Sequence, residues 1–127
     1  MDLRTVLTVL DGEIVSRQAD MQKVVHCGAA ADLMSDVLTF ARPDSVLLTG
    51  LTNPQVVRTA EMAGIEAIVF VRGKYPPDQT VDLAAEVGIP LLSTRYSMYE
   101  ACGRLYGAGL PGLGSCDPYA LTGQAEA

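Results

Sequence analysis

Basic and hydroxyl-bearing side chains gather after three short apolar segments, SVLLT (45–49), AIVFV (67–71) and PLLS (90–93). The residues that close or follow these segments are Thr49, Gly50, Thr52, Asn53, Arg72, Lys74, Thr94, Arg95 and Ser97. Guanidinium and ammonium groups form charge-assisted hydrogen bonds with phosphate or carboxylate, and a glycine lets a backbone N–H approach a ligand closely. The pattern predicts a binding site for a small anion or a nucleotide.

The three apolar segments must lie side by side for this site to exist. Segments that are apolar on both faces are typical of a parallel sheet covered by helices on each side. Each one is followed by turn residues and a helical period, which is the pattern of βαβ units. We therefore expect an α/β protein, a three-layer α/β/α sandwich with a small, mainly parallel sheet. Its strands would end at one edge, where open α/β sheets bind ligands.

Two of the predicted helices begin at that edge with residues that cap helix N-termini. Asn53 precedes Pro54, and Ser97 opens Ser97-Met98-Tyr99-Glu100, a capping box. Unpaired N–H groups at a helix N-terminus attract anions. The alternative is that both residues only cap their helices and that the nearby basic side chains are solvated charges.

The N-terminal part reads as a helix with Leu3, Val6, Leu7 and Leu10 on one face. We expect short strands at 13–16 and 23–27, and a helix at 32–41 with Leu33, Val37 and Phe40 on one face. Residues 108–127 are rich in glycine and lack periodic apolar spacing. We expect one domain at 1–107 and a flexible C-terminal tail at 108–127.

Catalytic and metal-binding signatures are missing from the sequence. It has no GxxxxGK[ST] and no GxSxG, and its single histidine, His26, stands beside Cys27 without a second cysteine at ligand spacing. We therefore expect no metal, no cofactor and no enzymatic activity. A small enzyme that uses Arg95, Asp78 and Glu100 is a further alternative, although no nucleophile–base pair is visible.

Charge and cysteine usage limit the function classes. The 127 residues carry a formal net charge of −6, whereas nucleic acids and anionic membranes need a basic face. No apolar run reaches the roughly 18 residues of a membrane span. The three cysteines, Cys27, Cys102 and Cys116, are odd in number and form no CxxC, which favours a reduced, cytoplasmic protein.

The last predicted helix carries Tyr99, Gly103 and Tyr106 beside its core face. Tyrosine suits protein interfaces, and a glycine permits close approach. We expect a homodimer that uses this surface. The alternative is that both rings fold onto their own domain.

Residues 50–105, from GLTNPQVVRTAEMAG through AIVFVRG to GIPLLSTRYSMYEACGRL, resemble the DRTGG domain. The earlier DLMSDVL and LLTG are also similar to stand-alone members, although the letters DRTGG do not occur in this sequence. The resemblance implies an α/β/α domain similar to the N-terminal domains of HPr kinase and Mur ligases. It also implies a regulatory, dimer-forming role beside catalytic or CBS modules.

Taken together, the residues and the resemblance favour a non-enzymatic regulatory module that senses a small anion or nucleotide. Short stand-alone members are similar to proteins encoded near iron-only hydrogenases. The alternative is therefore an accessory or docking protein for a redox enzyme, without a small ligand.

Overall fold

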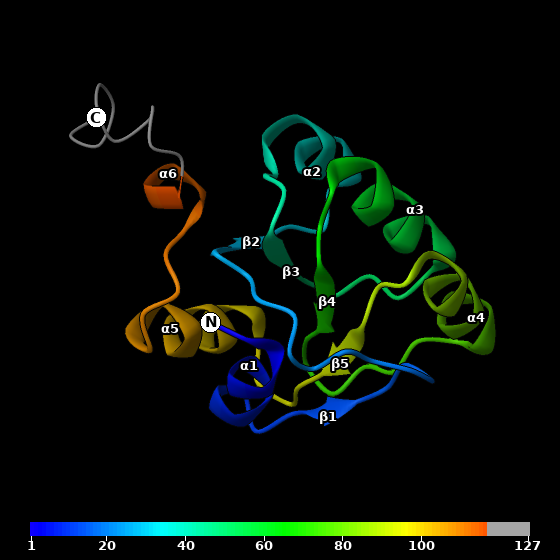
Figure 1. Cartoon of the computed structure of the whole chain (residues 1–127), viewed down its shortest axis with the longest axis horizontal. Helices are drawn as coiled ribbons and strands as arrows, with labels where there is room; N and C mark the ends of the chain where they lie inside the picture. The colour runs from blue at the N-terminus through cyan, green and yellow to red at the C-terminus, as the bar shows by residue number, and fades with distance from the viewer. Residues whose placement is uncertain (117–127) are drawn as a thin grey trace.

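The computed structural model describes residues 1–116 as an α/β fold (Figure 1). Its helices and strands, in chain order, are α1 Leu3–Val9, β1 Glu13–Ile14, β2 Cys27–Ala30, α2 Met34–Phe40, β3 Ser45–Thr49, α3 Pro54–Ala63, β4 Ala67–Phe70, α4 Asp78–Val87, β5 Leu91–Ser93, α5 Met98–Gly107 and α6 Leu113–Cys116.

Within the described residues the strands form a five-stranded sheet in the order β1-β5-β4-β3-β2. The pairs β2–β3, β3–β4 and β4–β5 are parallel, and only β1 runs antiparallel to its neighbour β5. The parallel strands are joined by α2, α3 and α4 in turn, as expected for successive βαβ units. The prediction of a small, mainly parallel sheet is confirmed.

Alternate residues of the strands supply two separate cores, which makes the molecule three layers thick. In β3, Val46 and Leu48 pack with α1 and α5, whereas Leu47 packs with α2, α3 and α4. Phe70 and Ile68 of β4 join the second cluster and are 0% exposed. Burying each such side chain contributes about 1.5–3 kcal/mol to the free energy of unfolding. The two cores therefore hold the sheet in place, and the sheet in turn positions the segments that follow its strands.

Helices α3 and α5 begin at the caps that the sequence predicts. Asn53 caps α3 by accepting a hydrogen bond from Val56 N, and Ser97 caps α5 by accepting one from Glu100 N. Gly64 and Gly88 end α3 and α4 with φ of 76° and 77°, a conformation that favours glycine.

The N-terminal third differs from expectation in three places. The strand expected at 13–16 is limited to Glu13–Ile14. The strand expected at 23–27 lies at Cys27–Ala30, and the helix expected at 32–41 is limited to Met34–Phe40. Of its expected apolar face only Val37 is buried, because Leu33 is 61% exposed and Phe40 is 64% exposed. A helix of seven residues makes only about two turns, and Leu33 lies before its first turn, so the expected apolar face is not presented as a whole to the core.

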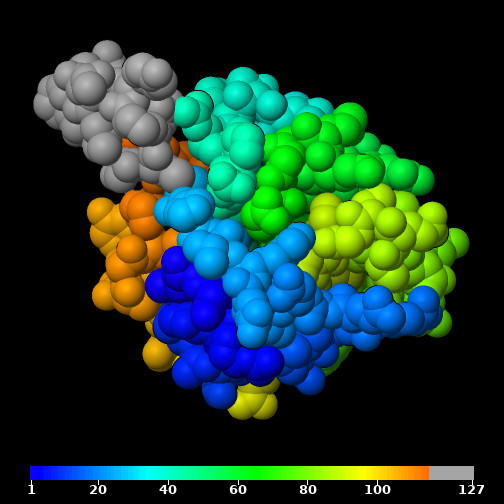
Figure 2. Space-filling view, in the orientation of Figure 1, coloured from blue at the N-terminus to red at the C-terminus, as the bar shows by residue number. Residues whose placement is uncertain are grey.

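The segment between β1 and β2 crosses the amino ends of the parallel strands, and Figure 2 shows it running over the front of the molecule. Lys23 Nζ donates to Gly88 O and pairs with Glu66 at 3.3 Å, while His26 N donates to Asp44 O. The amino edge is therefore covered, whereas the carboxyl edge carries the turns described below. None of the helices in residues 1–116 has the length and apolar character that crossing a membrane requires.

Residues 108–116 differ from the flexible tail that the sequence suggests. Leu110 is 4% exposed in the core beside α5, Pro111 O accepts a hydrogen bond from Gly28 N, and Gly112 forms a parallel bridge with Gly28. The domain thus extends beyond residue 107, because this segment covers the edge strand β2. The rest of the expected tail, 117–127, lies outside the described residues.

Candidate functional site

The predicted site residues lie at the carboxyl ends of β3, β4 and β5, which are neighbours in the sheet. Thr49 is the last residue of β3, Arg72 to Lys74 follow β4, and Thr94 and Arg95 follow β5. The antiparallel β1 begins at the same edge, because Glu13 pairs with Ser93 at the end of β5. The fold therefore brings these turns to one edge and adds the start of β1 to them.

The turn after β3 is held by a carboxylate that the sequence pattern does not indicate. Asp32 Oδ1 accepts hydrogen bonds from Thr49 Oγ1 at 2.9 Å and from Gly50 N at 2.8 Å. Lys74 Nζ donates to Gly50 O at 2.9 Å. The Gly50 N–H that we expected to hold a ligand anion is thus engaged by an internal anion, and Lys74 ties the turns after β3 and β4 together.

The surroundings of Gly50 leave room for a side chain. A Cβ at this position would lie 3.6 Å from Asp32 Oδ1 and 3.6 Å from Lys74 Nζ, which is ordinary van der Waals contact. An alanine therefore fits at this turn, and space alone does not require the glycine.

Thr52 and Asn53 have local structural roles. The Thr52 carbonyl accepts a hydrogen bond from the buried Thr80 hydroxyl at 2.7 Å, which fastens the turn to α4. Asn53 Oδ1 accepts from Val56 N at 3.3 Å as the cap of α3. Both residues lie beside the edge but position the helix that starts there.

The turn after β4 has an unusual backbone. Arg72 has φ of 63°, a left-handed conformation that side chains rarely adopt, and its N–H donates to Tyr96 O. Gly73 N donates to Thr94 O, and Lys74 O accepts from the Ser93 hydroxyl at 2.8 Å. These bonds hold the turn against the end of β5, while the Arg72 side chain stays exposed.

The turn after β5 divides into a buried and an exposed part. Thr94 is 2% exposed, and its hydroxyl donates to Leu10 O at 2.7 Å, which joins β5 to the end of α1. Arg95 is exposed, and Ser97 accepts from Glu100 N at 3.2 Å as the cap of α5. Arg95 is therefore the cation of this turn that is available to a ligand.

A polar hollow of about 260 Å³ lies beside Arg95, between the end of β5 and the start of β1. It is lined by Asp11, Gly12, Glu13, Tyr75, Ser93, Thr94 and Arg95. The Tyr75 hydroxyl donates to Glu13 Oε1, and this bond raises the pKa of the tyrosine. In this bond the phenol is the donor and the carboxylate is the acceptor.

Four residues of this edge, Asp11, Glu13, Tyr75 and Asp32, are not predicted from the sequence. The sequence places the strand before Asp32 at 23–27, whereas β2 lies at Cys27–Ala30. Asp32 is therefore assigned to the start of the helix expected at 32–41 and not to the end of a strand. Asp11 and Glu13 reach the edge only through the antiparallel pairing of β1 with β5. Tyr75 follows Lys74 directly, so its position next to a predicted cation is the one available signal.

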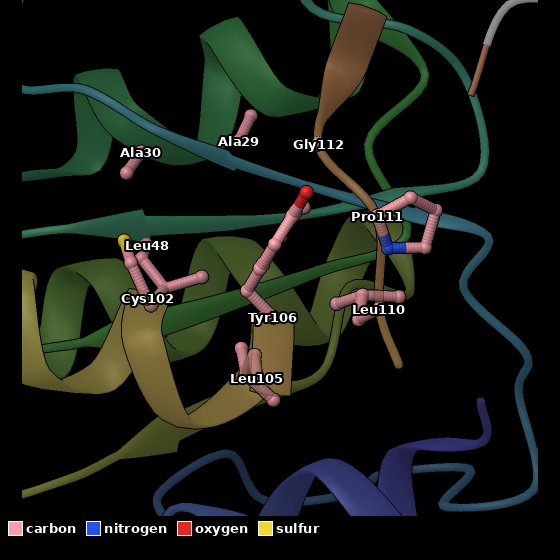
Figure 3. A pocket seen from close by; sticks show the side chains of 10 residues that line it. Ala29, Ala30, Leu48, Cys102, Leu105, Tyr106, Leu110, Pro111 and Gly112 are labelled. Atoms are coloured by element: carbon pink, nitrogen blue, oxygen red, sulfur yellow. The ribbon is translucent and has the colours of Figure 1, made fainter. Parts of the chain in front are cut away.

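A second hollow, apolar and about 110 Å³, lies between α5 and β2 under residues 110–112 (Figure 3). In Figure 3 Cys102 and Tyr106 extend from α5 toward Ala29 and Ala30 of β2. Burial raises the pKa of the Cys102 thiol, so the reactive thiolate is disfavoured. This hollow offers packing space rather than chemistry.

The expected interface residues are at the surface of α5. Tyr99 is 91% exposed and Tyr106 is 69% exposed, and a Cβ at Gly103 would meet no atom within 4 Å. Nearby, Arg104 stacks over the Tyr96 ring at 4.1 Å and pairs with Glu100 at 3.2 Å. The Tyr99 ring therefore does not fold onto its own domain.

The structure also shows where the side chains considered for an enzyme or a metal site lie. Of the three side chains considered for an enzyme, Glu100 is paired with Arg104, while Asp78 and Arg95 are exposed. Among residues 1–116 no group of three or more His, Cys, Asp or Glu side chains is placed to hold a metal ion.

Comparison with known proteins relates this geometry to a family. Curated protein sequences give no match. Among solved structures, the CBS and DRTGG domains of the regulatory region of Clostridium perfringens pyrophosphatase, complexed with the activator diadenosine tetraphosphate, share this fold. The TM-score is 0.65 at 15% sequence identity, and the match covers 87% of this chain and 47% of that chain. This chain thus spans about half the length of that neighbour. The model of the DRTGG domain family matches residues 5–108, so the chain belongs to the DRTGG domain family.

Proposed function

We propose that this chain is a non-catalytic regulatory module that binds a small anionic ligand or a nucleotide at the carboxyl edge of its sheet. One observation supports this proposal above the others: exposed Arg95 lines a polar hollow at this edge, and exposed Arg72 follows the adjacent strand, in a chain whose net charge is −6. Ligands of open α/β sheets bind at this edge.

The internal hydrogen bonds indicate where the acid group of a ligand would lie. Asp32 and Lys74 already satisfy the polar groups of the Gly50 turn. Thr49, Gly50, Thr52 and Asn53 would then support the neighbouring turn of the edge, with Thr94 and Ser97 holding the turn after β5. Arg95 and Arg72 would supply the charge to the ligand.

A likeness in fold supports the nucleotide class. The pyrophosphatase regulatory region, which contains CBS and DRTGG domains, was crystallised with the activator diadenosine tetraphosphate. That ligand carries several phosphates, which suit guanidinium groups. Diadenosine tetraphosphate is therefore the first compound to test on this chain, followed by mononucleotides, phosphorylated metabolites and acyl phosphates.

The test combines a thermal-shift screen with calorimetry. A ligand that binds only the native state raises the melting temperature by mass action. Losing one charge-assisted hydrogen bond of roughly 1.5–3 kcal/mol should weaken the best hit about ten- to a hundredfold in Arg95→Ala. The matched control is Arg58→Ala, an arginine on α3 with a 58% exposed side chain, which should bind as wild type does.

Two further results are expected of a charge contact at an exposed edge. The affinity of wild type should fall with added salt, and Arg95→Ala should change the free energy of unfolding by less than about 0.5 kcal/mol because the side chain is exposed. Equal binding by Arg95→Ala and wild type would contradict the proposed site. A screen without any hit would contradict the sensing function.

We also propose that the chain forms a homodimer through Tyr99, Gly103 and Tyr106. The exposed tyrosine rings stand beside a shallow hollow of about 460 Å³ lined by Ser97, Tyr99, Glu100, Gly103 and Arg104. Light scattering at tens of micromolar should report a dimer for wild type and a monomer for the double variant Tyr99→Ala/Tyr106→Ala. A monomeric wild type would exclude this interface.

A second candidate function is docking onto a redox enzyme, such as an iron-only hydrogenase system, without a small ligand. Apolar side chains exposed on and beside α2 and α3, namely Leu33, Leu38, Phe40 and Met62, favour it. A pull-down with wild type and with Phe40→Ser tests this candidate, since only docking requires that surface.

We further propose that the chain is located in the cytoplasm. We also propose that its fold is similar to that of the N-terminal domain of HPr kinase.

A further inference from the structure

We infer that the polar hollow beside Arg95 recognises a phosphorylated ribose, with the ribose hydroxyls donating to Asp11 and Glu13 and the phosphate meeting Arg95. The inference rests on the proposed function and specifies the ligand class of that same site. Four observations support it: the placement of the carboxylates, their charge, the role of Tyr75, and the unpaired side chains.

Backbone packing fixes the two carboxylates beside the end of β5. Glu13 is in register with Ser93, and Gly12 approaches so closely that a Cβ there would lie 2.7 Å from Ser93 O. The Thr94 hydroxyl bonds Leu10 O, one residue before Asp11. Asp11 and Glu13 are therefore held on the same rigid wall as Arg95.

The charges of the hollow do not suit a bare anion. Its charged lining residues are two carboxylates, Asp11 and Glu13, and a single guanidinium, Arg95. A simple phosphate would be attracted by one group and repelled by two. Carboxylates accept strong hydrogen bonds from hydroxyl groups, so a ligand that carries neighbouring hydroxyls as well as a phosphate satisfies both kinds of charge.

Tyr75 orders one side of this arrangement. Its hydroxyl donates to Glu13 Oε1, which leaves the other carboxylate oxygen of Glu13 to accept from a ligand. The bond to the Glu13 carboxylate raises the pKa of the tyrosine because it stabilises the protonated phenol. The residue is 59% exposed, and its ring offers a face on which a sugar or a base can pack.

Asp11 and Arg95 are available for binding. Within residues 1–116 neither side chain forms a hydrogen bond or an ion pair. Asp11 also has φ of 47°, a left-handed conformation that asparagine tolerates as well as aspartate does. The substitution Asp11→Asn therefore removes the charge and leaves the backbone in place.

The experiment compares three probes by calorimetry on the full chain: AMP, 2′,3′-dideoxy-AMP and inorganic phosphate. The variants are Asp11→Asn and Glu13→Gln. The matched control is Asp44→Asn, an exposed aspartate with φ of 66° that lies before β3 at the amino edge. Circular dichroism verifies that each variant is folded.

We expect wild type to bind AMP more tightly than dideoxy-AMP, and each of the two site variants to weaken AMP binding about tenfold. The same variants should leave dideoxy-AMP and inorganic phosphate unchanged or bound more tightly, because both carry a phosphate and a repelling charge is gone. Asp44→Asn should match wild type with all three probes.

Two patterns would overturn the inference. If Asp11→Asn or Glu13→Gln binds AMP as well as or better than wild type, the carboxylates do not accept from the ribose. If diadenosine tetraphosphate or another screened anion binds through Arg95 but AMP and dideoxy-AMP bind equally, the ribose is not recognised, and the proposed sensing function survives alone. Failure of every compound to bind would overturn both.

Discussion

Leu110 is the side chain whose removal best tests how far this domain extends toward its C-terminus. It is 4% exposed, packs in the cluster formed by α1, α5 and one face of the sheet, and lines the apolar hollow of about 110 Å³. Leucine-to-alanine substitutions in packed cores cost about 2–5 kcal/mol. Because one side of Leu110 faces the existing hollow, it has fewer contacts to lose. We expect Leu110→Ala to cost about 2–3 kcal/mol.

The assay is urea unfolding followed by far-ultraviolet circular dichroism, since the chain contains no tryptophan. A loss of about 2–3 kcal/mol lowers the ratio of folded to unfolded protein roughly 30- to 150-fold. Leu33→Ala is the matched control: this leucine is 61% exposed, so its truncation should cost less than about 0.5 kcal/mol.

Truncation extends the test to the whole C-terminal segment. A chain that ends at 116 keeps Leu110 and the bond from Gly28 N to Pro111 O, so it is the reference for a shorter chain. A chain that ends at 109 loses both and should be less stable than Leu110→Ala. If Leu110→Ala and the chain ending at 109 both unfold at the wild-type urea concentration, the packing argument is wrong.

Three smaller perturbations test the positioning of the edge and its helices. Gly12→Ala should destabilise the domain by about 1–3 kcal/mol in urea unfolding, because its Cβ would lie 2.7 Å from the backbone Ser93 O; unchanged stability would show that β1 can move away. Asn53→Ala should cost about 1 kcal/mol by loss of the α3 cap, and Asn53→Ser should restore most of it. The Asp2 carboxylate accepts from Thr5 N, which lowers the pKa of Asp2 below its ordinary 3.8. The stability advantage of wild type over Asp2→Ala should therefore be full above pH 3.8 and disappear as the pH falls through the lowered folded-state value; an advantage that persists in stronger acid would contradict this.

The regular half of the molecule follows from the sequence alone. Short segments that are apolar on both faces, such as 45–49 and 67–71, must be shielded from water on both faces. Such segments are typical of a parallel sheet that lies between two layers of helices. Caps such as Asn53 and Ser97 act through hydrogen bonds only three residues away. Such local rules place helix ends without any knowledge of the fold. The positions of Arg72, Lys74 and Arg95 at one edge follow from the same parallel arrangement.

Contacts between distant parts of the chain depend instead on the tertiary structure. Asp32 reaches the Gly50 turn because β2 and β3 are neighbours, and Glu13 reaches the end of β5 because β1 pairs antiparallel with it. A two-residue strand such as β1 has too few side chains for an apolar period, so its partner and direction come from packing alone. Leu110 is likewise buried by covering the β2 edge, among glycines whose spacing gives no periodic signal. Periodicity predicts how a segment buries its own face, whereas the carboxylates that join the cations at the edge, Asp32 and Glu13, depend on which strands become neighbours.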